Sequence, residues 1–308
     1  MQITGKTKVV GLMGWPVKHT FSPIMHNACF SQLNMDWVYL PFEVKPKGLK
    51  NAIFGLSALG IVGVNVTIPH KIEAMKYLTE IDERAKKIGA VNTILFKEDE
   101  KLGFNTDGEG FVKSLKDAGF EPKGKNVLLI GCGGAGRAIA VSLAYEGVKT
   151  LSLFDIQEER KNELCGLIKD NCCVQTFNGE IESYDLIINA TPLGMKENDP
   201  LPLDVSSIHS KQIVYDIIYN PPKTRLLIEA EKRGARIING VEMLIHQGAL
   251  SFEIWTGVYP RVEVMRRVIS QGSGVRGQES GVRGQGSGVR GQGSGVRGQG
   301  SGVKMRLC

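Results

Sequence analysis

The stretch VLLIGCGGAG at residues 127–136 decides how this chain is interpreted. Its first four residues are apolar and predict a short buried strand, and the glycines then turn the chain into a helix over 137–146. Gly131, Gly133 and Gly136 have the spacing G-x-G-x-x-G. In that pattern the glycines allow a tight turn, a close approach of backbone to a pyrophosphate, and close packing of helix on strand. The N-terminus of the helix would attract the pyrophosphate charge, so we predict a dinucleotide site.

The residues that follow the glycines support this prediction over the alternative, which is a structural turn. Gly147 is suited to end the helix, and a second strand over 150–154 leads into Asp155. An acid about 20 residues beyond the glycines is where a ribose hydroxyl would be bound.

Strand and helix patterns alternate along the chain both before and after this stretch. From 8 to 118, predicted strands carry polar residues at their ends, as in an open α/β sheet. From 127 onward the alternation continues to a helix over 241–255. At 308 residues the chain is long enough for about two domains. The predicted fold class is therefore α/β, with two open α/β domains.

Composition excludes several classes of protein. The formal net charge is +6, but residues 271–308 hold six basic residues and one acid, which leaves about +1 for the rest. The basic balance therefore does not indicate nucleic-acid binding. The six cysteines lack metal-ligand spacing, and there is neither a signal peptide nor a membrane-spanning apolar run. We expect a reduced, cytoplasmic protein with no metal and no membrane partner.

The C-terminal segment 271–308 has a different character from the rest. The heptapeptide QGSGVRG recurs with period seven, and the segment holds 13 glycines and no aromatic residue. Such a composition cannot bury enough apolar area to offset chain entropy, and glycine at this density excludes a coiled coil. We predict a flexible tail.

The first group of candidate site residues lies between a strand at 8–14 and a helix beginning at Pro23. Thr20 and Ser22 could present two hydroxyls to a small carboxylate. The alternative for Ser22 is a helix N-cap, for which serine is well suited. Both interpretations remain open on these residues alone.

A second group lies at the ends of other predicted strands. Asn65 and Thr67 share one face of a strand over 63–68, and Lys71 opens the helix predicted after it. A lysine at a helix N-terminus opposes the helix dipole, so it calls for a reason beyond a place on the surface. Asn92 lies near the start of a further strand predicted over 90–95, and Asp107 is either an N-cap or a functional acid.

These residues lie in motifs that are similar to those of the shikimate dehydrogenase family. The resemblance covers about residues 8–267, in family order, and the tail has no counterpart. The first hydroxyl position is usually serine in the family and is Thr20 here. The matching motifs are HTFSP at 19–23, NVTIPHK at 65–71, GAVNT at 89–93, NTDG at 105–108, GCGGAG at 131–136, NATPLGM at 189–195, YNP at 219–221 and NGVEMLIHQ at 239–247.

The resemblance implies reversible reduction of 3-dehydroshikimate to shikimate with a nicotinamide cofactor, in aromatic amino-acid biosynthesis. Reducing a ketone leaves an alkoxide that must take up a proton, so an acid/base is needed. By analogy Lys71 is that acid/base and Asp107 orients it while binding a substrate hydroxyl. Thr20, Ser22 and Tyr219 would bind the carboxylate, and the ring hydroxyls would be bound by Asn65, Thr67, Asn92 and Gln247.

The resemblance also implies an N-terminal substrate domain and a Rossmann-type domain with a cleft between them. We expect boundaries at 1–106 for substrate binding, 107–240 for the cofactor, 241–270 for helices that pack back on the substrate domain, and 271–308 for the tail. The cofactor would contact Gly131, Cys132, Gly133, Gly134, Ala135, Gly136, Asp155, Thr191, Ile217, Gly240, Met243 and Glu83.

The choice between NADP and NAD depends on the end of the second strand of the cofactor domain. Most of the family use NADP and carry an arginine there, whereas this chain has Asp155 and no arginine before Arg160. A carboxylate accepts hydrogen bonds from the ribose hydroxyls of NAD and repels the 2′-phosphate of NADP, which favours NAD. Arg160 or Lys161 could reverse that preference.

Two alternative functions are left open by the sequence. One is an enzyme that acts on quinate as well as shikimate or instead of it. The other is a ligand-sensing or scaffolding relative that has lost catalysis. The presence of Lys71 and Asp107 argues against this second alternative. The chain would be a monomer or a homodimer.

Overall fold

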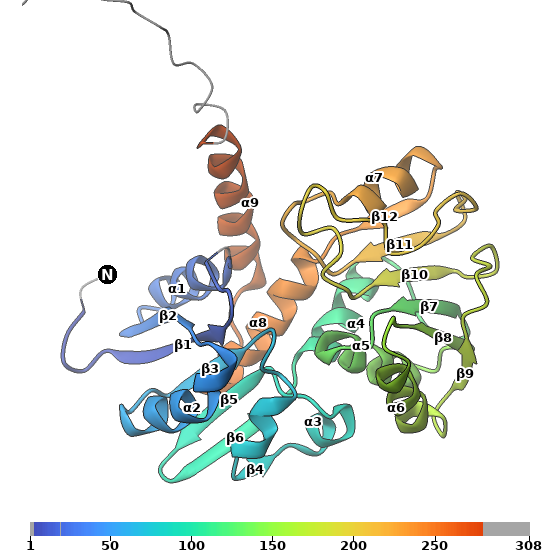
Figure 1. Cartoon of the computed structure of the whole chain (residues 1–308). Helices are drawn as coiled ribbons and strands as arrows, with labels where there is room; N and C mark the ends of the chain where they lie inside the picture. The colour runs from blue at the N-terminus through green and yellow to red at the C-terminus, as the bar shows by residue number, and fades with distance from the viewer. Residues whose placement is uncertain (1–2, 19, 280–308) are drawn as a thin grey trace, which may run out of the picture. The chain divides into compact units, whose positions relative to one another are not determined.

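The computed structural model describes residues 3–18 and 20–279 of the chain. Within these residues, twelve strands form two six-stranded sheets (Figure 1). Both sheets belong to one compact unit, residues 1–270. No helix among the described residues has the length and apolarity needed to cross a bilayer.

The first sheet has the order β2-β1-β3-β5-β6-β4 and is mixed. Strand β1 pairs in parallel with β2 and β3, whereas β5 runs antiparallel to both β3 and β6. The two-residue strand β4 was not predicted from the sequence and pairs in parallel with β6. The strands are β1 (Lys8–Gly14), β2 (Trp37–Glu43), β3 (Gly63–Val66), β4 (Glu80–Ile81), β5 (Thr93–Lys97) and β6 (Glu100–Phe104).

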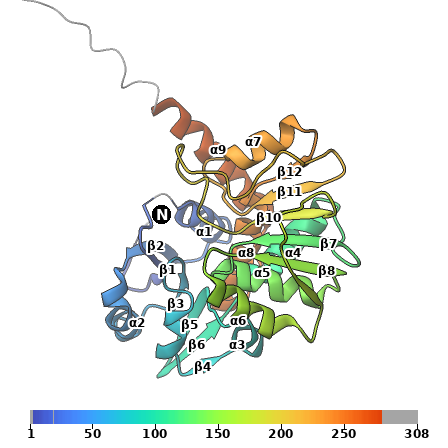
Figure 2. The same ribbon diagram turned by 45° about the vertical axis from the view of Figure 1, so that its right-hand side comes forward.

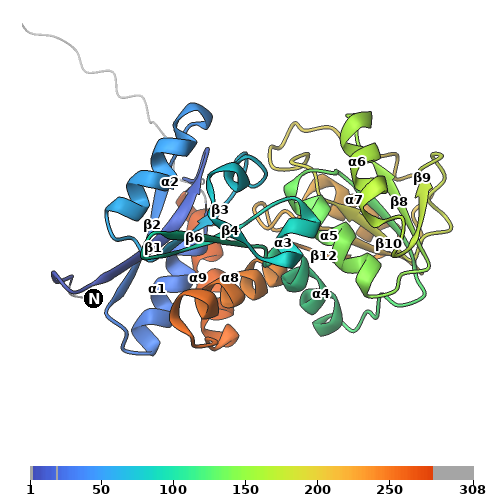
Figure 3. The same ribbon diagram turned by 90° about the horizontal axis from the view of Figure 1, so that it is seen from below.

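Helices cover both faces of this sheet, as Figure 3 shows. Successive residues of a strand point to opposite faces, so Leu12 and Met13 of β1 enter different cores. The core of Leu12 is closed by α1 (Ser22–Gln32), α8 (Val241–Thr256) and α9 (Val262–Glu279). The core of Met13 is closed by α2 (Leu49–Ala58), which follows the short 3-10 helix η1 (Pro46–Gly48).

The second sheet is entirely parallel and has the order β12-β11-β10-β7-β8-β9. Numbered from its own first strand, this order is 3-2-1-4-5-6 read from β9, that of a dinucleotide-binding Rossmann fold. The predicted fold class is therefore confirmed. The strands, most of them labelled in Figure 2, are β7 (Asn126–Ile130), β8 (Thr150–Phe154), β9 (Cys173–Thr176), β10 (Leu186–Asn189), β11 (Ile213–Asp216) and β12 (Arg236–Ile238).

Strand β7, which is buried from Val127 to Ile130, again divides its residues between two cores. Val127 and Leu129 pack with α4 (Asp107–Asp117), α5 (Gly134–Tyr145) and α6 (Glu158–Ile168). Leu128 and Ile130 pack with α7 (Arg225–Lys232) on the other face. The strand order reverses at β7, the position at which open α/β sheets bind ligands.

The last helix differs from the expectation for the tail. The sequence predicts no regular structure from residue 271, yet α9 continues to Glu279. Met265 and Ile269 are buried in the core and fix the helix, and each further residue then adds a backbone hydrogen bond without a new nucleation cost. The repeats from 280 onward lie outside the described residues.

Candidate active site

Lys71 and Asp107 form a short ion pair. The distance from Lys71 Nζ to Asp107 Oδ2 is 2.5 Å, and the two side chains are 14% and 6% exposed. A charge-assisted hydrogen bond of this kind is strong when it is shielded from water. The structure therefore brings together the predicted acid/base and its orienting acid.

Lys71 is held by the turn that follows β3. The carbonyl of Lys71 accepts the backbone N–H of Val91 at 2.8 Å, and the N–H of His70 donates to the carbonyl of Thr67. His70 is buried, and its Nε2 lies 2.7 Å from the carbonyl oxygen of Val44. Three neighbouring segments thus fix the backbone that carries the lysine.

The predicted helix at Lys71 is corrected by the structure. Lys71 lies in a turn, and the helix that follows is the 3-10 helix η2 (Glu73–Tyr77), which begins two residues later. The objection to a lysine at a helix N-terminus therefore does not apply. The reason for its position is the ion pair with Asp107.

Asp107 is placed by the asparagine that precedes it by two residues. The side chain of Asn105 accepts the backbone N–H of Asp107 at 3.1 Å and donates to the carbonyl of Ala90 at 2.9 Å. Asp107 is the first residue of α4, and its carboxylate accepts from Lys71 and from Asn92 Nδ2, the latter at 2.9 Å. The carboxylate is used at the site, so Asp107 is not an N-cap.

Asn92 and Asn65 are both buried, and their amide hydrogens are taken by protein acceptors. Asn92 Nδ2 lies 2.8 Å from Thr106 Oγ1 and 2.9 Å from Asp107 Oδ1, while Asn92 Oδ1 accepts the N–H of Thr106. Asn65 Nδ2 lies 2.8 Å from Ser251 Oγ and also contacts Thr93 Oγ1 and the carbonyl of Asn92. Asn65 can therefore only accept a hydrogen bond from a ligand.

The loop before α1 brings two hydroxyls together. Thr20 Oγ1 lies 3.2 Å from both the hydroxyl and the backbone N–H of Ser22. Tyr219, which follows β11, lies at the same place, since its ring centroid is 5.5 Å from that of Phe21. The three residues predicted to bind a carboxylate are thus grouped together.

Ser22 is not the N-cap that was the alternative prediction. Helix α1 begins at Ser22 itself, with Phe21 at the N-cap position and no side-chain cap hydrogen bond. The hydroxyl of Ser22 is engaged instead with Thr20 Oγ1, at 3.2 Å. This outcome favours the functional interpretation.

The two remaining substrate candidates are Thr67 and Gln247. Thr67 directly follows β3 and is half-buried. Gln247 of α8 lies within 3.3 Å of Asn92 Nδ2 through its Oε1, and its Nε2 donates to the carbonyl of Leu244. One N–H of Gln247 remains for a ligand, because a primary amide carries two.

The loop between β7 and α5 has the form expected for pyrophosphate binding. A Cβ on Gly136 would lie 1.9 Å from the carbonyl oxygen of Gly131, and Gly131 itself has φ +99°. No atom lies within 4 Å of a Cβ placed on Gly133, so space is open there. Gly133 is the N-cap of α5 without a side-chain cap, which leaves first-turn N–H groups to a ligand. The residues present fit a dinucleotide.

Cys132 and Asp155 join this loop to the end of β8. Asp155 accepts the N–H of Cys132 at 2.7 Å and that of Gln157 at 2.8 Å, one on each carboxylate oxygen. Each oxygen keeps a lone pair for a ribose hydroxyl. Burial, reinforced by Asp155, raises the pKa of the Cys132 thiol to about 12.

The other predicted cofactor residues follow neighbouring strands of the parallel sheet. Thr191 comes after β10, Ile217 after β11 and Gly240 after β12, and these strands are adjacent. The methyl of Thr191 lies 2.9 Å from a Cβ placed on Gly131. Met243 of α8 is buried in the core beside this edge. Apart from Met243, these residues lie at one edge of the sheet with the glycine loop.

Glu83 does not join this group. It opens α3 (Glu83–Ile88), is exposed, and pairs with Lys86 at 2.6 Å. None of its hydrogen bonds or ion pairs among the described residues is with the glycine loop. The predicted cofactor contact of Glu83 has no support in this geometry.

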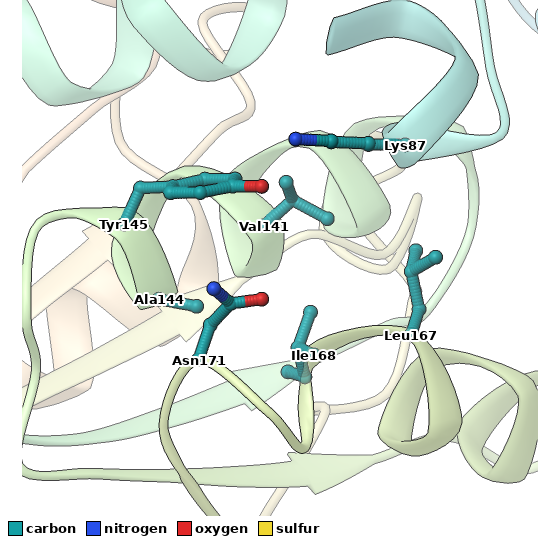
Figure 4. Close-up of a pocket in the computed structure, with 7 residues that line it drawn as sticks. All are labelled: Lys87, Val141, Ala144, Tyr145, Leu167, Ile168 and Asn171. Carbon is teal, nitrogen blue, oxygen red and sulfur yellow. The ribbon is translucent and has the colours of Figure 1, made fainter. Parts of the chain in front are cut away.

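A separate hollow lies outside this site. Figure 4 shows it between the end of α3, α5 and α6, with a volume of about 300 Å³. Lys87 and Tyr145 meet across it, with Nζ 5.6 Å from the ring centroid. None of the residues predicted to bind substrate or cofactor lines it.

One cluster of side chains has the composition of a metal site. In the described part of the chain, Asp117, Glu242 and His246 bring one ligand atom each within 4.8 Å of one another. Arg266, however, already pairs with both carboxylate oxygens of Glu242 at 2.7 Å. The Arg266–Glu242 ion pair and the hydrogen bond between His246 and Asp117 therefore tie α4, α8 and α9.

Sequence reasoning missed the hydroxyls that surround the two buried asparagines: Tyr39, Thr93, Thr106 and Ser251. Ser251 lies one helical turn beyond Gln247, so the i, i+4 spacing on α8 was a usable signal. Tyr39 gave no local signal, because it meets Asn65 only through the pairing of β2, β1 and β3.

Comparisons with known proteins agree with this site. Residues 12–94 match the shikimate dehydrogenase substrate binding domain, and residues 240–269 match the shikimate 5′-dehydrogenase C-terminal domain. The curated shikimate dehydrogenase (NADP(+)) of Desulforamulus reducens is 44% identical over 87% of this chain and 96% of its own length. That of Methanocaldococcus jannaschii is 46% identical, over 87% and 98%.

Solved structures give the same result. Shikimate 5-dehydrogenase from Listeria monocytogenes, in complex with shikimate and NAD, is 37% identical and superposes with a TM-score of 0.80, covering 87% of this chain and 98% of its own. Fold, site and sequence identity therefore agree, and this chain belongs to the shikimate dehydrogenase family.

Proposed function

We propose that this protein catalyses the reversible reduction of 3-dehydroshikimate to shikimate with a nicotinamide cofactor. The observation that carries the proposal is the shielded Lys71–Asp107 pair directly beside the glycine loop. A ketone reduced at this place becomes an alkoxide, and Lys71 Nζ is the group that gives it a proton. In the reverse direction the same nitrogen removes the proton from the hydroxyl.

The other polar residues fit a polyhydroxylated carboxylate. Thr20, Ser22 and Tyr219 supply hydroxyl groups for the carboxylate. Asn65 accepts from a ring hydroxyl, whereas Gln247 has an N–H to donate. Asp107 holds Lys71 and accepts from a second hydroxyl, and Thr67 and Asn92 complete the set. Shikimate dehydrogenases usually carry serine at the position of Ser22, whereas some quinate-active relatives carry threonine, and this supports a preference for shikimate over quinate.

The cofactor would be held by the glycine loop, Asp155 and the strand-end residues Thr191, Ile217 and Gly240. A nicotinamide, when bound, supplies or accepts the hydride. The protein would place the pyrophosphate at the N-terminus of α5 and the nicotinamide end of the cofactor next to Lys71.

We favour NAD over NADP for this chain. The carboxylate of Asp155 lies at the N–H groups of the glycine loop, where it would meet a 2′-phosphate with like charge. Lys161 cannot compensate easily, since it is buried and pairs with Glu158 at 2.6 Å. Arg160 is exposed and has no ion pair among the described residues, so it is the residue that could hold a phosphate. The curated relatives above carry NADP(+) in their names, which supports the opposite choice.

Steady-state kinetics test both parts of the proposal. We expect kcat/KM to be higher for shikimate than for quinate, and higher with NAD than with NADP. Asp155→Asn should improve the use of NADP. No oxidation of shikimate with either cofactor would refute the activity. A preference for NADP in the wild type, unchanged in Asp155→Asn, would refute only the cofactor choice.

A further inference from the structure

A fully buried carboxylate at the end of β11 has no part in the site described above. Asp216 accepts three hydrogen bonds: from Thr224 Oγ1 at 2.6 Å on Oδ2, and from the N–H of Ile218 at 3.0 Å and Asn189 Nδ2 at 3.1 Å on Oδ1. Burial raises the pKa of Asp216, and these hydrogen bonds oppose the rise. A buried acid costs free energy even when its oxygens are satisfied, which points to a role for Asp216 beyond packing.

The three donors belong to three segments of the cofactor domain. Asn189 is the last residue of β10, Ile218 follows β11, and Thr224 is the N-cap of α7. Strands β10 and β11 are adjacent and parallel, and β10 also pairs with β7, which leads into the glycine loop. Open α/β sheets bind ligands at the carboxyl ends of their strands. One carboxylate thus ties together the segments that leave the sheet beside the glycine loop.

The orientation of the Asn189 amide follows from Asp216. Asp216 Oδ1 faces the backbone N–H of Ile218, which can only donate, so Oδ1 is an acceptor and the NH2 of Asn189 is the group that faces it. Asn189 Oδ1 then faces Thr191, where it accepts the backbone N–H at 3.1 Å and the hydroxyl at 2.7 Å. Asn189 Nδ2 also donates to the carbonyl of Leu193 at 3.1 Å.

This orientation fixes what Thr191 offers to a cofactor. A hydroxyl has one hydrogen, and that of Thr191 is given to Asn189 Oδ1, which can only accept. One lone pair of Thr191 Oγ1 accepts the N–H of Leu193 at 3.1 Å. The methyl of Thr191 lies against the glycine loop, 2.9 Å from a Cβ placed on Gly131. Thr191 therefore has one lone pair left, which accepts from a hydroxyl or amide of the cofactor, and it has no hydrogen to donate to a phosphate.

The segment after β11 is held by the same carboxylate. The N–H of Ile218 donates to Asp216, and the carbonyl of Ile218 accepts the N–H of Gly240 at 3.1 Å. A Cβ on Gly240 would lie 1.9 Å from the carbonyl oxygen of Ile217, so these two candidate cofactor residues are in contact. Loss of the Asp216 carboxylate would release this segment together with the Asn189 amide.

We propose that Asp216 is a positioning residue for the nicotinamide cofactor. It acts through Asn189, whose amide it orients so that Thr191 accepts rather than donates, and through Ile218, whose N–H it holds. This inference rests on the proposed function, but cofactor binding can be measured without shikimate.

The test is the dissociation constant of the reduced cofactor, followed by the fluorescence of NADH and of NADPH in the absence of shikimate. Asp216→Ala leaves three buried donors without an acceptor, and we expect it to raise Kd by about five- to thirtyfold for whichever cofactor the wild type binds more tightly. Asp216→Asn keeps an oxygen for the two N–H donors and turns its NH2 to the Thr224 hydroxyl, which can accept. Its Kd should therefore stay within about threefold of the wild type.

Asn189→Ala breaks the same link from the other side. It should raise Kd by a factor similar to that of Asp216→Ala. The double variant should raise Kd by at least about threefold less than the product of the two single effects, because the two residues act through one hydrogen bond.

Gln212→Ala is the matched control. Gln212 is buried directly before β11, at the opposite end of the strand from Asp216, and its Nε2 donates to the carbonyls of Ile181 at 2.6 Å and Tyr184 at 3.0 Å. Its replacement should lower the free energy of unfolding, as Asp216→Ala does, and leave Kd unchanged.

Several results would overturn the proposal: a normal Kd in Asp216→Ala, an equal rise of Kd in Asp216→Asn or in Gln212→Ala, or additive effects in the double variant. If Asp216→Ala does not fold, Asn189→Ala decides alone, and a normal Kd in that variant overturns the proposal. If the wild type binds neither NADH nor NADPH, the proposed function fails and this inference fails with it. Binding of either cofactor without oxidation of shikimate refutes only the activity, and the Kd values still decide on Asp216.

Discussion

Gly134 of the glycine loop lies against the side chain of Lys71. A Cβ placed on Gly134 would lie 3.1 Å from Lys71 Cβ and 3.3 Å from Lys71 Cδ. The segment that would hold the cofactor and the residue that would move the proton are therefore in contact. A side chain at position 134 must displace the lysine stem or the loop.

Gly134→Ala should therefore lower kcat. A shift of the lysine of a few tenths of an ångström weakens its alignment with the reacting oxygen, and we expect a loss of about ten- to a hundredfold. The measurement is kcat with shikimate at saturating cofactor. Gly166→Ala in α6 is the control, because no atom lies within 4 Å of its added Cβ. Equal kcat values in both variants would contradict the coupling.

Lys71→Ala should remove the proton donor itself. General acid–base catalysis contributes about 10²–10⁴ in rate, so kcat should fall by that factor while KM for shikimate changes less than about threefold. Lys76→Ala is the matched control, since Lys76 is exposed and its one ion pair among the described residues is with Glu73, at 2.8 Å. A Lys71→Ala enzyme with near-normal kcat would disprove the assignment.

His26 should make stability depend on pH in the acid range. Burial lowers its pKa from 6.5 to about 3, so between these values the unfolded chain binds a proton that the folded protein does not. The free energy of unfolding should therefore fall by about 1.4 kcal/mol for each pH unit between 6.5 and 3 through this residue. Above pH 6.5, His26 does not make the free energy of unfolding depend on pH.

His26→Phe isolates this contribution. The variant keeps an aromatic ring and loses no hydrogen bond among the described residues. Urea unfolding at pH 7.5 and pH 4.5 should show a smaller difference in the variant than in the wild type. Parallel losses in the two proteins would show that His26 does not titrate as described.

The thiols should differ sharply in reactivity. The thiolate is the reactive form, and burial raises the pKa of Cys132 to about 12 and that of Cys29 to about 11. Cys173 is exposed. Among the described cysteines, iodoacetamide at pH 8 should label Cys173 first and leave Cys132 and Cys29 unmodified, as followed by peptide mass spectrometry. Unfolded protein should be labelled at all three, and rapid native labelling of Cys132 would contradict its burial.

Much of the fold could be predicted because its signals are local. The apolar run before Gly131 and the alternation of strands with helices predicted the parallel sheet, and the strand at 150–154 was placed without error. The strand predicted from residue 90 begins only at Thr93. The reason is that the backbone N–H groups of Val91 and Asn92 donate to the carbonyls of Lys71 and Phe104. Such hydrogen bonds join segments that are distant in sequence, so a local pattern does not predict them.

The site likewise contains residues that could be predicted from local motifs and residues that could not. Lys71 and Asp107 could be predicted to act together from motifs, and the structure brings them together. The contacts of Tyr39 and Ser251 with Asn65 could not be predicted, since Asn65 and Ser251 are 186 positions apart and meet only after α8 packs against the first sheet. The sequence also does not show which amide hydrogens already donate to acceptors within the protein.

That packing of α8 has a consequence for synthesis on the ribosome. Ile245, Phe252 and Trp255 of α8 complete the core built on β1 and α1, and Trp255 Nε1 donates to the carbonyl of Ile94. The first sheet thus leaves the ribosome with one face covered only by α1 and must wait for residues 241–256, whereas the parallel sheet is complete once β12 has emerged. The nascent N-terminal half should therefore depend on chaperones, and a fragment ending at residue 106 should aggregate rather than fold.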